Sequence, residues 1–69
     1  MIAPAQLRAM ARTWRALPER ERAIFAAVRF EALDYVQAAR RYGCTIDDVE
    51  HTITRVLVAL DEAASQHEP

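Results

Sequence analysis

Apolar residues recur every three or four positions along most of the chain, which is the spacing of amphipathic helices. The first apolar stripe consists of Leu7, Met10, Ala11, Trp14 and Leu17. Pro4 suits a first helical turn, and Pro18 is expected to end this helix because the residue before a proline avoids the helical conformation. The pattern predicts one helix over 4–17 and a second over 18–31.

Two capping boxes and one glycine divide the second half of the chain. Asp34 is followed three residues later by Gln37, and Thr45 is followed three residues later by Asp48. In such a box each side chain accepts a hydrogen bond from a backbone N–H at the start of a helix. Gly43 is the only glycine, and it is expected to end a short helix in the left-handed conformation.

These signals predict two further helices, over 35–42 and 45–64. The apolar stripe of the longer one comprises Ile46, Val49, Ile53, Val56, Leu57 and Leu60. A short helix, a glycine turn and a long helix form a helix-turn-helix, here over about residues 35–62. One glycine and three prolines supply little turn chemistry for a sheet. We therefore predict a single all-α domain over 1–69, with four helices and no strand.

Composition and motif content disfavour several classes of protein. No apolar run approaches the roughly 18 residues of a membrane span, and arginines interrupt the N-terminal stretch, so we expect no membrane contact. Cys44 is the only cysteine, which suits a reducing cytoplasm. His51 and His67 lie far apart in sequence, so neither a metal nor another cofactor is expected. No nucleophile–base pair or phosphate loop occurs, so we do not expect an enzyme.

The net charge of −1 hides a division of the chain into a basic front and an acidic back. Residues 1–43 carry eight arginines against four acidic residues, whereas 44–69 carry one arginine against six acidic residues. All nine basic residues are arginine. Such asymmetry is typical of proteins that meet a charged partner, either nucleic acid or another protein.

The stretch LPERERAIFAAVRFEALDYVQAARRYGCTIDDVEHTITRVLVAL resembles region 4 of bacterial sigma-70-type factors, especially the extracytoplasmic-function class. The resemblance covers about residues 12–62. It rests on an LPERER opening joined to the glycine-turn motif A-x-x-x-G-x-x-x-x-x-V of the helix-turn-helix. The matching positions are Leu17, Pro18, Glu19, Arg20, Arg22, Phe25, Glu31, Leu33, Tyr35, Ala39, Gly43, Thr45, Val49 and Arg55. Ala32 stands where the family usually has glycine, and Asp34 stands where it usually has serine.

The resemblance implies that the helix from Ile46 reads promoter-type duplex DNA in the major groove. It also implies that Arg40 and Arg41 lie near phosphates, and that the domain touches RNA polymerase in bacterial cytoplasm. At 100° per residue, an outward face of the long helix lies opposite its apolar stripe. The candidate DNA contacts are Arg40, Arg41, Thr45, Asp47, Asp48, Glu50, His51, Thr54 and Arg55.

The recognition helix departs from the family because its outward face is acidic, where lysine or arginine is common. Acids oppose the phosphate neutralisation that drives DNA affinity, although a carboxylate can accept from cytosine N4. Asp47 and Asp48 also suit a helix N-terminus, where the dipole favours negative charge. Two hypotheses therefore stay open: a small DNA-binding transcription regulator, or a protein-interaction module with little DNA affinity.

The interaction module would bind RNA polymerase, a sigma factor or itself, as a weak homodimer. Val58 is its candidate contact, because this apolar residue is predicted on the outward face beside Val56 and Leu57. With 69 residues the chain has no counterpart of the sigma region that binds polymerase and melts promoter DNA. We expect a stand-alone small protein and not a complete sigma factor.

Overall fold

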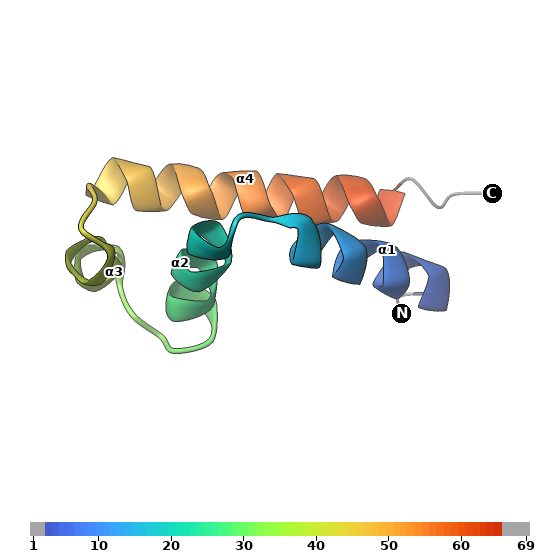
Figure 1. The fold of residues 1–69 in the computed structure, drawn as a ribbon, viewed down its shortest axis with the longest axis horizontal. Coiled ribbons are helices and arrows are strands. Elements are labelled where there is room, and N and C mark those ends of the chain that lie inside the picture. The colour runs from blue at the N-terminus through green and yellow to red at the C-terminus, as the bar shows by residue number, and fades with distance from the viewer. Residues whose placement is uncertain (1–2, 66–69) are drawn as a thin grey trace.

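The computed structural model describes residues 3–65 and consists of four helices. They are α1 (Pro4–Ala16), α2 (Glu19–Arg29), α3 (Tyr35–Tyr42) and α4 (Ile46–Ser65). No strand occurs within 3–65, so the predicted all-α fold is confirmed. The molecule measures 42 × 17 × 16 Å. Figure 1 shows why: α4 runs along its length, α3 lies at the start of α4, and α1 lies along the second half of α4.

Five predicted helix boundaries lie one or two residues from the observed ones: the end of α1, both ends of α2 and both ends of α4. Leu17 is extended and ends α1, and Pro18 is the N-cap of α2 and does not lie within it. α2 ends at Arg29 and not near residue 31, because the chain then turns through Phe30 towards a left-handed Ala32. The number and the order of the helices are as predicted.

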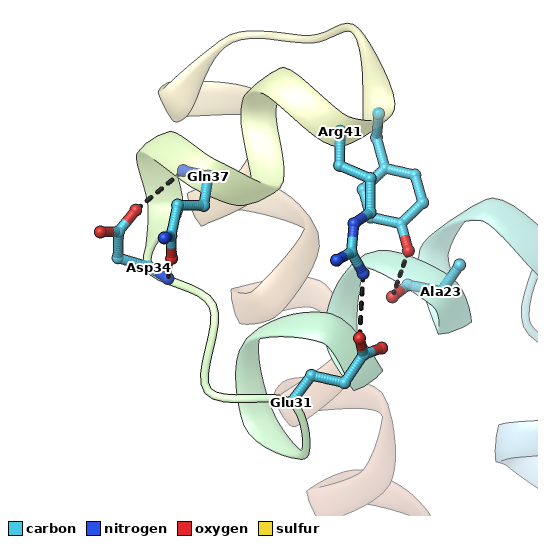
Figure 2. Close-up of polar contacts among 6 residues, drawn as sticks. Ala23, Glu31, Asp34, Gln37 and Arg41 are labelled. Carbon is cyan, nitrogen blue, oxygen red and sulfur yellow. Dashed lines mark hydrogen bonds and ion pairs between the residues drawn. The ribbon is translucent and has the colours of Figure 1, made fainter.

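Both predicted capping boxes are present. At the start of α3, the Gln37 N–H donates to Asp34 Oδ1 at 2.8 Å, and the Asp34 N–H donates to Gln37 Oε1 at 2.9 Å (Figure 2). At the start of α4, the Asp48 N–H donates to Thr45 Oγ1 at 3.0 Å, and the Thr45 N–H donates to Asp48 Oδ2 at 3.1 Å. These bonds fix where each helix of the helix-turn-helix begins.

Gly43 makes the turn between α3 and α4 as predicted. Its φ is +63°, and the Cys44 N–H donates to Ala39 O at 3.0 Å, the six-to-one bond of a glycine-type helix end. A second left-handed residue, Ala32 with φ +60°, follows α2. There the Leu33 N–H donates to Ala27 O at 3.1 Å.

The core lies where α2, α3 and α4 meet. It comprises Ile24, Phe25, Ala38, Ala39, Val49, Ile53 and Val56, with Trp14 packed against it. Val49 and Val56 are fully buried, and the small side chains of Ala38 and Ala39 let α3 lie close to α4. The rings of Trp14 and Phe25 meet edge to face, with centroids 5.6 Å apart.

Two members of the predicted α4 stripe are not buried. Ile46 is 46% exposed and Leu57 is 42% exposed, whereas Thr52 is buried. The apolar stripe of α4 is wider than the surface that α1, α2 and α3 cover. Its edge residues Ile46 and Leu57 therefore stay in contact with solvent.

The predicted stripe of α1 is only partly buried, and it is Trp14 and Leu17 that pack against the core. Leu7 is 53% exposed, and the only buried residue of α1 is Ala9. Gln6 connects the start of α1 to the end of α4, because its Nε2 donates a hydrogen bond to Ala64 O at 3.2 Å. The contact of α1 with the rest of the molecule therefore combines the Gln6 hydrogen bond at its start with the packing of Trp14 and Leu17 at its end.

Candidate nucleic-acid interface

The outer side of α4 is open to solvent along its length. Val49 and Val56 anchor the opposite side of the helix in the core, and Gly43 with the two capping boxes sets α4 against α3. The predicted outward residues are all exposed: Asp47, Asp48, Glu50, His51, Thr54, Arg55 and Val58. Their placement agrees with the sequence, while their roles towards DNA stay predictions.

Some of these exposed groups are already engaged within the chain. Asp48 serves the cap of α4, and the hydrogen bond from the Thr45 N–H holds the pKa of its carboxyl below the usual value. Arg55 Nη2 lies 3.5 Å from Glu21 Oε2 of α2. Within 3–65, four outward side chains form no hydrogen bond or ion pair: Asp47, Glu50, His51 and Thr54. All four are among the DNA contacts predicted from the sequence.

The two arginines near the turn have different surroundings. Arg41 Nη1 lies 2.9 Å from Glu31 Oε1, and this hydrogen bond raises the pKa of Arg41 (Figure 2). The neighbouring Tyr42 hydroxyl donates to Ala23 O at 3.3 Å. Arg41 thus helps to fasten α3 to the end of α2, whereas Arg40 is exposed and, within 3–65, has no such partner.

An open cleft of about 460 Å³ lies beside the first half of α4, between it and the start of α2. Its lining includes Arg20, Cys44, His51 and Arg55. The Arg20 Nη2 donates to the carbonyl oxygen of Tyr42, which holds the guanidinium beside the turn. Glu21 and Asp48 also line it, so the cleft combines two arginines and a histidine with two acids beside the outer side of α4.

The family of the chain is shown by a comparison with known proteins. A family model for sigma-70, region 4 matches residues 7–60. The chain belongs to the sigma-70 region 4 family. Domains of this family are DNA-binding helix-turn-helix domains of transcription that also bind RNA polymerase, and they are not catalytic. No curated protein and no solved structure matches the chain.

In this region 4 domain, sequence reasoning missed Arg20 as a member of the candidate interface. Its side chain reaches a carbonyl 22 residues along the chain, and no periodicity within one helix reports such a contact. The signal was present all the same, because Arg20 belongs to the LPERER opening that carries the resemblance.

Two further features of the region 4 domain bear on its possible ligands. No group of three metal-ligating side chains occurs within residues 3–65, and His67 lies outside that range. In the part of the chain that the structure describes, no helix has the length and apolarity needed to cross a bilayer.

Proposed function

We propose that this chain is a small DNA-binding regulator of transcription in bacterial cytoplasm, reading promoter-type duplex DNA with α4. The observation that carries the proposal is the free outer side of α4, held in fixed orientation by its buried side and by the capped turn. In a helix-turn-helix the first turns of the second helix meet base edges in the major groove.

Arginines of the preceding helices supply the phosphate contacts in this proposal. Arg20 and Arg40 are both exposed, and Arg20 borders the cleft beside α4. Arginine suits this task because its planar guanidinium can bind two phosphate oxygens at once. Arg41 acts indirectly, by holding α3 in place through Glu31.

The two acids of α4 that form no ion pair within 3–65 are expected to affect both the affinity for DNA and the preference for its sequence. Asp47 and Glu50 face the phosphate field and lower affinity for any sequence, so the isolated chain binds in the non-specific range of about 10⁻⁴–10⁻⁶ M at physiological salt. Carboxylates accept hydrogen bonds from cytosine N4, so the same groups add preference at the base edges. His51 and Thr54 complete the face one turn further along α4.

The test is the affinity for duplex DNA at several salt concentrations, with the charge of one surface changed at a time. Arg40→Gln should weaken binding of all sequences and reduce the slope of log affinity against log salt by about 0.9, as expected for one lost phosphate contact. Replacing Asp47 and Glu50 with lysine should tighten binding severalfold and steepen that slope. Arg12→Gln is the matched control, because Arg12 is an exposed arginine of α1.

A second candidate, the protein-interaction module, has one specific observation in its favour. The exposed side of α4 combines acids with two apolar residues, Leu57 and Val58, which are 42% and 50% exposed. A module of this kind binds RNA polymerase, a sigma factor or itself with little DNA affinity. It takes the place of the regulator if the lysine variants bind DNA no better and Arg40→Gln binds no worse.

A further inference from the structure

An apolar groove lies at the end of the molecule away from the helix-turn-helix. It has a volume of about 420 Å³ and lies between α1, the end of α2 and the second half of α4. Its lining includes Leu7, Met10, Trp14, Phe25, Phe30 and Leu60. Phe30 is 73% exposed and Leu7 is 53% exposed, so two of the largest apolar side chains of the protein face water there.

The helices that flank this groove carry opposite charge. The charged residues of α1 are all arginines: Arg8, Arg12 and Arg15. At the end of α2, the guanidinium of Arg29 lies 6.0 Å from the centroid of the Phe25 ring, at the edge of the groove. The second half of α4, Leu57–Ser65, has two charged residues, both acidic: Asp61 follows Leu60 of the groove, whereas Glu62 lines a different pocket.

We propose that this groove is the docking surface for a second copy of the chain, related by a two-fold axis. A two-fold interface uses the same patch on both copies, so the patch must complement itself. An apolar centre with a basic helix on one side and an acidic helix on the other meets this condition. The basic α1 of each copy then lies against the acidic half of α4 of the other. A partner with charge of a single sign would match only one of the two sides.

The arrangement of the two helices supports such an axis. The bond between Gln6 and Ala64 places the start of α1 level with the end of α4, so the helices run antiparallel (Figure 1). Asp61 follows Leu60 of the groove and, at 100° per residue, lies beside the exposed Leu57. An axis parallel to these helices brings this acidic edge over α1 of the other copy.

The size of the protein sets the expected strength. A standard interface buries about 800 Å² of each partner, which is about a sixth of the 4879 Å² accessible surface of this chain. We expect the groove and its two flanks to bury less than this, as weak assemblies do. We expect a dissociation constant on the order of 10–100 μM.

Sedimentation equilibrium of the full chain without DNA, from low micromolar to millimolar protein, tests the proposal. The wild type should rise from monomer to dimer mass and stop there. Phe30→Ser should weaken the dimer at least about tenfold, as removal of a central aromatic anchor does. The helix content of this variant should stay unchanged because Phe30 is 73% exposed, while its urea midpoint should fall only slightly, through loss of the edge-to-face contact with Phe25 at 6.2 Å. Val58→Ser is the control, since Val58 is an exposed apolar residue of α4 that does not line the groove.

A second pair of variants tests the charge argument. Asp61→Arg makes both sides of the groove basic and should weaken the dimer, whereas Glu62→Arg, one position further around α4, should affect it much less. A wild type that stays monomeric at millimolar concentration overturns the proposal and leaves the groove to a different protein. Loss of the dimer in Val58→Ser but not in Phe30→Ser also overturns it, because the contact then lies on the outer side of α4. None of these readouts depends on DNA binding.

Discussion

Replacing Ala32 with glycine should stabilise the protein. Ala32 has φ +60°, a conformation that costs an L-residue with a Cβ about 1–2 kcal/mol. Its side chain is exposed, so removing the methyl group sacrifices little packing. Glycine has more conformational freedom than alanine in the unfolded chain, and this extra entropy offsets about 0.4–1 kcal/mol of the stability gained by relieving the strain. The net expectation is a rise of about 0.5–1 kcal/mol in the free energy of unfolding.

Urea unfolding followed by circular dichroism, together with thermal unfolding, measures this change. A gain of this size should raise Tm by about 2–8 °C in a domain of this length, and the slope of free energy against urea should stay constant. Gly43→Ala is the reciprocal variant, because Gly43 has φ +63° and a Cβ there would meet no atom within 4 Å. It should lose about as much stability as Ala32→Gly gains, and Gly43→Val should lose more, since β-branched residues resist this conformation most. If Ala32→Gly is neutral or destabilising, Ala32 is not strained and the description of the α2–α3 turn is wrong.

Two other substitutions test the cap of α4 and the packing behind it. Asp48→Asn should destabilise the protein near neutral pH. The carboxyl of Asp48 has a folded pKa below its usual 3.8, so its stabilising effect is present above that pH and is lost as the pH falls through the lowered pKa. The difference in urea midpoint between wild type and variant should therefore shrink on acidification, and a difference that is the same at all pH values would contradict this role. Val56→Ala should cost about 2–3 kcal/mol in urea unfolding, because Val56 is fully buried. Val58→Ala should change stability by less than about 0.5 kcal/mol, and equal losses at the two positions would mean that the burial of α4 is misassigned.

The parts of the fold that were predictable from sequence depend on contacts a few residues apart. The two capping boxes join residues three positions apart, and the turn at Gly43 needs only a residue that tolerates positive φ. The likeness of LPERER and the following helices to sigma region 4 then gave the family, which the match to residues 7–60 confirmed. Local chemistry and one family pattern therefore account for the four helices and their order.

The rest depends on packing between helices, which periodicity does not report. The spacing of Ile46 and Leu57 marks them as buried, yet both are substantially exposed because the covering helices are short. Arg41 stays a predicted phosphate contact, but the sequence pattern does not report that Glu31, ten residues away, forms an ion pair with it. The left-handed Ala32 carried no signal of its own, apart from the glycine that the family usually has there.

The weak anchoring of the first half of α1 has a consequence for local unfolding. Trp14 and Leu17 pack against the core at the end of the helix, whereas its first half buries only Ala9, and the N-cap residue Ala3 provides no side-chain bond. α4, by contrast, buries Val49 and Val56 completely. Amide hydrogens in the first half of α1 are therefore expected to exchange with solvent through local opening, at a free energy well below that of global unfolding. Those in the first half of α4 are expected to exchange only on global unfolding, so the helix-turn-helix should keep its shape while the start of α1 opens locally.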